Sequence, residues 1–174
     1  MTQTDTQIRS TLDRVKQTFT ARPGSARGTY LARAEAGPGL SATASEGDWK
    51  FDVGMPEAMG GTGAAPTPGV YGRAALLGCL AISLRMEAIS AGLAHARVGV
   101  DMEYEMDSCG MFGIGGATPS FEAIRLTVEV ESDAPEADLR AWLDRTMARS
   151  PWMDVFCRPQ PVSVDLRIVA PGAG

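Results

Sequence analysis

The residues of this chain with the widest chemical range are its cysteines, because a thiolate can act as a nucleophile, a metal ligand or a redox centre. There are three cysteines, Cys79, Cys109 and Cys157, and one histidine, His95. The cysteines are widely separated and form no CxxC pair. A structural zinc site needs about four Cys or His ligands at short spacing, so we expect neither a metal nor a bound cofactor. This sparse, odd set favours a reducing compartment and predicts a cytoplasmic protein.

Cys79 lies within an apolar run, AALLGCLAISL, between Arg73 and Arg85. Only a thiolate attacks a peroxide, so a thiol in apolar surroundings needs a nearby cation. The two arginines lie six residues either side of Cys79. On a helix this spacing places them about two-thirds of a turn away from it, so neither is an obvious partner. The alternative is that Cys79 is only a small apolar residue in a tight helix packing.

The run around Cys79 predicts a helix over residues 68–93 that stops at Gly92, a residue type common just after helices. Its charge-free stretch is 11 residues long. A membrane span needs about 20 residues, so we expect a core helix and no membrane partner. A helix that is apolar on every side must be covered all round. One domain of this size can hardly supply that cover, so we expect a second subunit to complete it.

The remaining patterns predict the elements that position this helix. Apolar residues at helical spacing predict an amphipathic helix over 4–20, and we expect residues 1–22 to form a helical arm on a single domain, residues 23–174. Alternating residues predict strands over 27–36, 40–44, 48–53, 97–106, 121–132 and 162–168. We expect a second helix capped at Asp133 with Trp142 in the core, and a short helix capped by Ser150. This order predicts an α+β fold with mostly antiparallel sheet.

The overall composition of the chain excludes further classes of function. The chain has 174 residues, 44% apolar and 21% charged, which suits one folded domain. Its net charge is −5 and no cluster of Lys and Arg is visible, so we expect no nucleic-acid partner. The polar N-terminus, which contains acidic residues, is not typical of a signal peptide. We expect His95 at the surface, just beyond the central helix.

Taken in order, these features resemble the OsmC/Ohr family of osmotically inducible and organic-hydroperoxide-resistance proteins. The resemblance begins with a GG-x-x-x-x-P-x-P motif before the apolar helix that carries Cys79. It continues with a D-x-x-G-x-x-G turn after the strand to Met106, with Ser150-Pro151, and with the closing VSVDLRI segment. The matching positions are Gly60, Gly61, Pro66, Pro68, Gly92, Asp107, Gly110 and Gly113. In element order the match covers roughly residues 26–169.

The resemblance implies an intertwined homodimer in which sheet wraps two buried central helices, with thiol sites at the subunit interface. It implies that a cysteine at the position of Cys79 attacks the peroxide. In active family members a Glu about ten residues earlier pairs with an Arg from the N-terminal strands, and a Cys-Pro near the C-terminus closes a disulfide. The corresponding residues here are Gly69 and Ser150. Two parts of the peroxidase machinery are therefore absent from this sequence.

Two hypotheses follow from the resemblance. The first is a thiol peroxidase of oxidative-stress defence that reduces organic hydroperoxides, divergent because of Gly69 and Ser150. Cys79 is its candidate nucleophile, Arg27 its candidate thiolate partner and Cys157 its candidate resolving thiol, or an external dithiol resolves it. The second is a non-catalytic protein of the same fold that binds a small lipophilic ligand at the dimer interface. That pocket is expected to be lined by Leu76, Leu80, Met86, Trp152 and Phe156.

Overall fold

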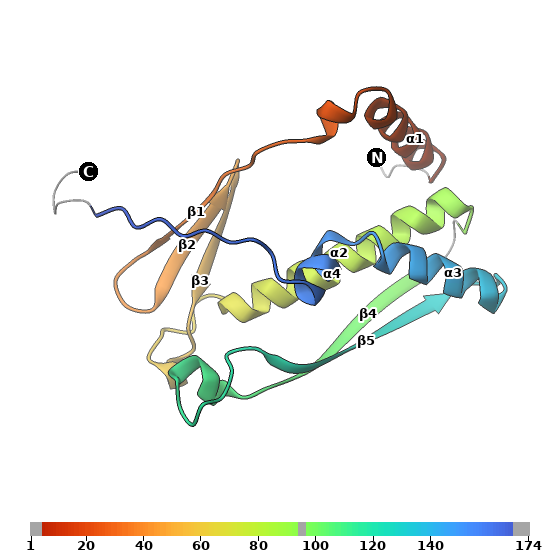
Figure 1. Ribbon diagram of the computed structural model, residues 1–174. Helices are drawn as coiled ribbons and strands as arrows, with labels where there is room; N and C mark the ends of the chain where they lie inside the picture. The colour runs from red at the N-terminus through yellow and green to blue at the C-terminus, as the bar shows by residue number, and fades with distance from the viewer. Residues whose placement is uncertain (1–4, 94–96, 169–174) are drawn as a thin grey trace.

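The computed structural model describes residues 5–93 and 97–168. Over these ranges the helices are α1 (Asp5–Ala21), α2 (Pro68–Ala91), α3 (Glu136–Met147) and α4 (Pro151–Cys157), with 3-10 turns η1 (Pro23–Ala26), η2 (Glu57–Met59) and η3 (Ser108–Phe112). The strands are β1 (Ala32–Ala36), β2 (Ser41–Glu46), β3 (Trp49–Gly54), β4 (Arg97–Met106) and β5 (Phe121–Glu131) (Figure 1). This mixture confirms the predicted α+β class. The expectation for His95 lies outside the described residues.

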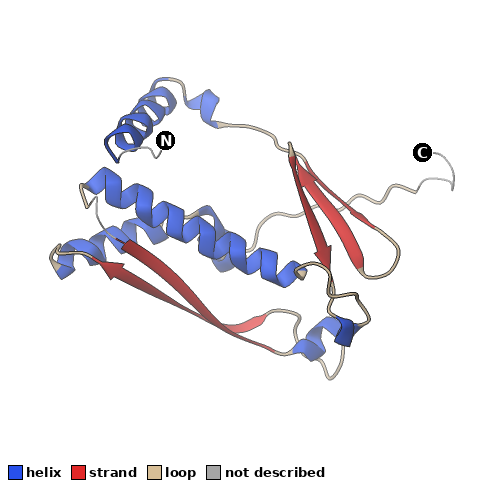
Figure 2. Ribbon diagram, turned by 180° about the vertical axis from the view of Figure 1, so that it is seen from behind, coloured by secondary structure: helices blue, strands red, loops and turns tan. Residues whose placement is uncertain are grey.

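The ends of α2 are set by local chemistry. The Thr67 side chain caps its start by accepting the N–H of Val70 at 3.4 Å, and Pro68 occupies the first turn. Gly92 ends it with φ of 84°, a left-handed conformation that favours glycine. The predicted end of this helix at Gly92 is therefore confirmed. α2 runs through the middle of the molecule beside the β4–β5 hairpin (Figures 1 and 2).

One face of α2 forms the core. Its most buried residues follow the spacing of one helix face: Leu76, Leu80, Leu84, Ala88 and Ile89. Leu84 and Ala88 pack against Trp142 of α3, and valines of β4 and β5 close the cluster. The Trp142 indole N–H donates to the Leu84 carbonyl at 3.0 Å, and the side chain is 1% exposed. The prediction that Trp142 belongs to the core is confirmed.

The opposite face of α2 is open to solvent in this single chain. Ile82 is 64% exposed and Met86 is 41% exposed. The expectation that α2 is covered all round is therefore not met by the described residues of one chain. By length and composition α2 could also cross a membrane, but core helices pass the same test. Its buried face packs against α3 and β4, as expected for a core helix.

Both sheets of the described chain are antiparallel, as predicted. β4 pairs with β5 from Arg97 opposite Glu131 to Met106 opposite Phe121, and β1, β2 and β3 form a meander in that order. Figure 2 shows the β4–β5 hairpin lying along α2, whereas the β1–β3 sheet stands near the end of α2 where that helix begins. The core therefore forms on β4–β5 and leaves β1–β3 to one side.

Three predicted elements differ from the structure. β1 begins at Ala32, and residues 27–31 lie outside it. α3 starts after Pro135, without a side-chain cap, because a proline disfavours helical geometry in the residue before it and delays the start beyond Asp133. Residues 162–168 form no strand, since the described chain offers them no strand partner. Their alternating apolar side chains are 81–89% exposed: Val162, Val164, Leu166 and Ile168.

α1 docks on the C-terminal end of α2 through polar contacts. Arg85 donates to both carboxylate oxygens of Asp5, at 2.8 and 2.9 Å. Nε of Arg9 donates to the Ile89 carbonyl at 2.9 Å, which places a positive charge near the negative end of the helix dipole. No residue of α1 is buried. The division into an arm of residues 1–22 and a domain of residues 23–174 stays a prediction.

Candidate functional site

Cys79 meets Ser150 where the middle of α2 approaches the start of α4. The Sγ of Cys79 lies 3.6 Å from the Oγ of Ser150. Cys79 is half-buried between Leu76 and Leu80 of the buried face of α2. Ser150 is only 3% exposed. The nucleophile candidate and the serine that replaces the expected second cysteine are thus neighbours.

Ser150 is held in place by its role as the cap of α4. Its Oγ accepts the N–H of Met153 at 3.4 Å, and Pro151 occupies the first helical position, as the sequence predicted. A hydroxyl accepts through its lone pairs and keeps its one hydrogen to donate. That hydrogen is therefore available to the Cys79 sulfur. The sequence predicted the cap but not this contact, for which the only signal was the family position of Ser150.

The other two cysteines lie elsewhere. Cys109 is exposed on η3, where its backbone N–H donates to an Asp107 carboxylate oxygen at 2.8 Å. Cys157 is exposed at the last residue of α4. At 1.5 Å per residue it lies about 10 Å along the helix axis from Ser150. Cys79, Cys109 and Cys157 are all described and all free.

Three arginines come into consideration as partners of Cys79, and the structure gives none of them a contact with its sulfur. Arg27 follows η1 and is exposed, and within residues 5–93 and 97–168 its side chain makes no hydrogen bond or ion pair. The guanidinium carbon of Arg73 sits 4.6 Å from the ring centroid of Tyr104, a cation–π contact. Arg85 pairs with Asp5. The described residues of one chain therefore do not bring the candidate Arg27 to Cys79.

Gly69 stands in the first turn of α2 at the position of the expected Glu. A Cβ at Gly69 would lie 2.9 Å from Nη1 of Arg73. Real Cβ atoms do not approach this closely, so a larger residue would displace the Arg73 guanidinium. Because the clashing atom is the end of a flexible side chain, a small shift of Arg73 would relieve it.

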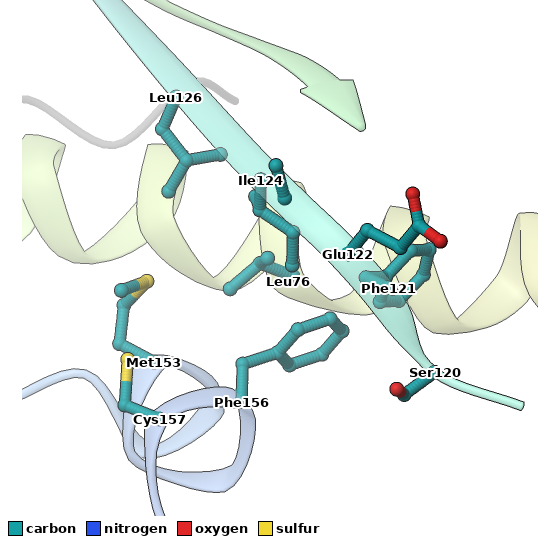
Figure 3. Close-up of a pocket in the computed structure, with 10 residues that line it drawn as sticks. Leu76, Ser120, Phe121, Glu122, Ile124, Leu126, Met153, Phe156 and Cys157 are labelled. Carbon is teal, nitrogen blue, oxygen red and sulfur yellow. The ribbon is translucent and has the colours of Figure 1, made fainter. Parts of the chain in front are cut away.

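An open pocket of about 470 Å³ lies between α2, β5 and α4 (Figure 3). Its apolar wall consists of Leu76, Phe121, Ile124, Leu126, Met153 and Phe156. Leu76 lies one turn before Cys79, and Met153 lies one turn after Ser150, but neither Cys79 nor Ser150 itself lines the pocket. Figure 3 shows Cys157 beside Met153 on one wall and Ser120 with Glu122 at one end. Its volume falls in the range of small-molecule sites.

Only some of the residues that the sequence predicted to line a ligand pocket line this one. Leu76 and Phe156 line it, whereas Leu80 is fully buried in the core and Met86 lies exposed on α2. Trp152 packs against Phe156 without joining the wall. Among the described residues, no group of three or more His, Cys, Asp or Glu side chains could hold a metal ion.

An ion pair steadies the outer side of α4. Arg158 donates through Nε and Nη2 to the two carboxylate oxygens of Asp154, each at 2.5 Å. These hydrogen bonds hold the pKa of Asp154 below its ordinary value and raise the pKa of Arg158. Asp154 lies on α4 and Arg158 directly follows its last residue, so the pair is a solvent-exposed contact across the last turn of the helix.

Comparison of the sequence with models of protein families identifies one matching family. The family model described as OsmC-like protein matches residues 61–165. The comparison with curated proteins gives no match. The matched region contains α2 with Cys79 and α4 with Ser150, and it excludes α1 and the β1–β3 sheet.

Solved structures share the fold. An OsmC-like protein from Mycoplasma pneumoniae is 14% identical, with a TM-score of 0.61, covering 74% of this chain and 86% of the other. A putative osmotic stress induced and detoxification response protein from Psychrobacter arcticus is 12% identical, with a TM-score of 0.53 and coverages of 74% and 89%. A putative organic hydroperoxide resistance protein from Vibrio cholerae is 18% identical, with a TM-score of 0.51 and coverages of 75% and 87%. Since the family model spans more than half of the sequence and these folds agree, the chain belongs to the OsmC-like protein family.

Proposed function

We propose that this chain is a cytoplasmic, thiol-dependent protein that reduces organic hydroperoxides, with Cys79 as the attacking thiol. The observation that carries the proposal is the 3.6 Å contact between Cys79 Sγ and Ser150 Oγ. It sets Cys79 beside the start of α4, where the resemblance to active family members implies a second cysteine. The description of the Vibrio cholerae neighbour as a putative organic hydroperoxide resistance protein supports the same chemistry.

The reaction needs one thiolate and an external reductant. The Cys79 thiolate attacks one peroxide oxygen, so an S–O bond forms while the O–O bond breaks. The leaving alkoxide takes a proton and departs as an alcohol. Sulfur has then lost two electrons to the peroxide and is a sulfenic acid. Two thiol groups of an external reductant, such as a dithiol, supply the electrons that return Cys79 to its thiol.

The pocket supports an apolar substrate. Its wall of Leu76, Phe121, Ile124 and Phe156 would bury an alkyl or aryl group, and Leu76 lies one helical turn from Cys79 on α2. A buried apolar group gains about 25 cal/mol per Å² of surface removed from water. We therefore propose small lipophilic hydroperoxides as the substrate class.

We further propose that the protein acts as a homodimer. The support is the amount of apolar surface that one chain leaves open, on Ile82 and Met86 of α2 and on the alternating residues of segment 162–168. Open apolar patches of this kind mark interaction surfaces. Arg27 remains the candidate partner of the Cys79 thiolate. Because Arg27 does not contact Cys79 within one chain, we propose that the second subunit supplies this arginine.

Peroxide consumption by the full-length protein tests this function. With cumene hydroperoxide and dithiothreitol we expect turnover by the wild type and only the background rate from Cys79→Ser. Cys109→Ser is the matched control and is expected to keep the wild-type rate, because Cys109 is exposed on η3 away from the pocket lining. Turnover that survives Cys79→Ser, or no turnover by the wild type, would contradict the proposal.

The alternative function is binding of a small lipophilic ligand without chemistry. The observation that favours it is the 470 Å³ pocket itself, together with the loss of the family Glu and second Cys. The reaction of Cys79 with an aromatic disulfide across pH separates the two functions. A fast reaction supports the peroxidase. An inert Cys79, with an apolar fluorescent probe that binds to the wild type but not to Met153→Lys, supports the binding protein.

A further inference from the structure

We propose that Glu122 makes the pocket between α2, β5 and α4 selective for charge. The pocket then takes apolar molecules that have a neutral or cationic polar group, and it disfavours carboxylates. This rests on the proposed function for the statement that the ligand is a hydroperoxide, and it narrows that substrate class to uncharged and cationic hydroperoxides. The selectivity itself concerns binding, so it can be measured without any reaction at Cys79.

The composition of the pocket wall is the first argument. Of the 10 residues that line the pocket, Glu122 is the only one that carries a charge. The remaining side chains are apolar, apart from the hydroxyl of Ser120 and the thiol of Cys157. Figure 3 shows Ser120 and Glu122 together at one end of the pocket. A ligand whose apolar group fills the pocket therefore meets a carboxylate at that end.

A β-bulge brings Glu122 to this wall. Glu105 pairs with Ala123 and Met106 pairs with Phe121, so Glu122 has no partner residue on β4. A regular strand directs consecutive side chains to opposite faces, whereas a bulge redirects them. Phe121 and Glu122 can therefore line the same pocket, and the exposed Glu122 side chain adds its charge to a mostly apolar wall.

The arginines of the same elements do not balance this charge. Four arginines lie on α2 or β5 or directly after α4, and neither they nor their partners line the pocket. The pairs are Arg73 with Tyr104, Arg85 with Asp5, Arg125 with Glu103, and Arg158 with Asp154. Within residues 5–93 and 97–168, Glu122 forms no hydrogen bond or ion pair. A ligand carboxylate would thus meet an unpaired negative charge and no positive charge in the pocket wall.

The exposure of Glu122 sets the size of the effect. Water and salt weaken the interaction of an exposed carboxylate with a ligand charge. We expect a change of about threefold in affinity for each unit of ligand charge, and so about a tenfold difference between a cation and an anion of the same shape. In about 1 M salt, where charges are screened beyond about 3 Å, this difference should shrink to about twofold.

Three ligands that share one apolar group test the selectivity. We measure the affinities of phenylbutylamine, phenylbutanol and phenylbutyrate for the full-length protein by calorimetry. The methyl NMR signal of Met153, assigned with Met153→Leu, shows whether each ligand occupies this pocket. For the wild type we expect the amine to bind about tenfold more tightly than the carboxylate, with the alcohol between them.

Substitutions at Glu122 should change this order. Glu122→Gln should bring the three affinities within about twofold of one another, and Glu122→Lys should reverse their order. Glu129→Gln is the matched control, because it removes the same charge from the same strand outside the pocket lining. It should behave as the wild type.

The outcomes separate this proposal from the proposed function. Equal affinities of the wild type for the amine and the carboxylate would overturn the charge selectivity, and so would an order that survives Glu122→Gln. A Met153 signal that none of the ligands shifts would also overturn it. In each of these cases, turnover of cumene hydroperoxide that depends on Cys79 would leave the peroxidase standing. The expected order of affinities without any turnover would instead contradict the peroxidase and uphold the selectivity of the pocket.

Discussion

The two sheets of the described chain are built from similar alternating strands, yet only one of them has a core. β4–β5 lies against α2 and α3, and its inward valines close the cluster around Leu84 and Trp142. The β1–β3 sheet has no such cover, and Trp49 on β3 is 72% exposed. Alternation therefore predicts that a strand has one apolar face, but it does not say which chain covers that face. The β4–β5 sheet is therefore packed by α2 and α3 of its own chain, whereas the described residues leave the β1–β3 sheet uncovered.

The packed half should be the most sensitive to truncation. Trp142→Ala removes a buried indole and its hydrogen bond to the Leu84 carbonyl, so we expect a loss of about 3–5 kcal/mol in the free energy of unfolding. Urea denaturation measures it. Trp142→Phe keeps a ring and loses the hydrogen bond, and should cost about 1 kcal/mol. A loss below that for Trp142→Ala would contradict a core centred on α2 and α3.

Segment 162–168, which like the β1–β3 sheet is left open by the described chain, should respond through assembly. If a second copy covers segment 162–168, Leu166→Asp removes about 1.5–3 kcal/mol of apolar burial and adds a charge to the interface. We expect the dimer to dissociate at least tenfold more readily, measured by light scattering after size exclusion. Ser163→Asp places the same charge on the other side of the segment and should leave the dimer intact. A monomeric wild type would refute this prediction.

The N-terminal cap of α2, where the chain passes from the β1–β3 sheet to the packed core, should contribute less to the free energy of unfolding. Thr67 caps α2 where the chain arrives from β3, and Thr67→Ala leaves the Val70 N–H without its side-chain acceptor. We expect a loss of about 1 kcal/mol in the free energy of unfolding. Thr67→Ser keeps the acceptor and should match the wild type within experimental error. Equal losses in the two variants would show that the cap does not matter.

The smallest expected effect is on the local stability of α4, through the ion pair between Asp154 and Arg158, and it depends on pH. The pKa of Asp154 is lowered in the folded protein by hydrogen bonds from Arg158. A lowered carboxyl pKa stabilises the fold above the ordinary pKa, and that contribution is lost as the pH falls through the lowered one. Asp154→Asn should therefore speed amide exchange in α4 slightly at neutral pH and make no difference well below the carboxyl range. The same difference at every pH would rule out the ion pair as its cause.

The sequence by itself determined the elements whose signals are local. Pro68 and Gly92 bound α2, Ser150 and Pro151 start α4, and alternation defines β4 to the residue. The order of these motifs was also enough to indicate the family, since each depends on neighbouring residues along the chain. The same locality explains the error at Asp133, where a capping pattern was overridden by the geometry that Pro135 imposes.

The tertiary structure alone decided which distant groups meet. The contact between Cys79 and Ser150 joins residues 71 positions apart, and the Arg73–Tyr104 contact crosses from α2 to β4. No periodicity records such pairs, because they depend on how helices pack after they form. The same reason explains segment 162–168, whose pattern is that of a strand but which pairs with no strand among the described residues. A strand forms only when its backbone groups hydrogen-bond to a neighbouring strand, and which segment lies beside it is decided by the tertiary structure.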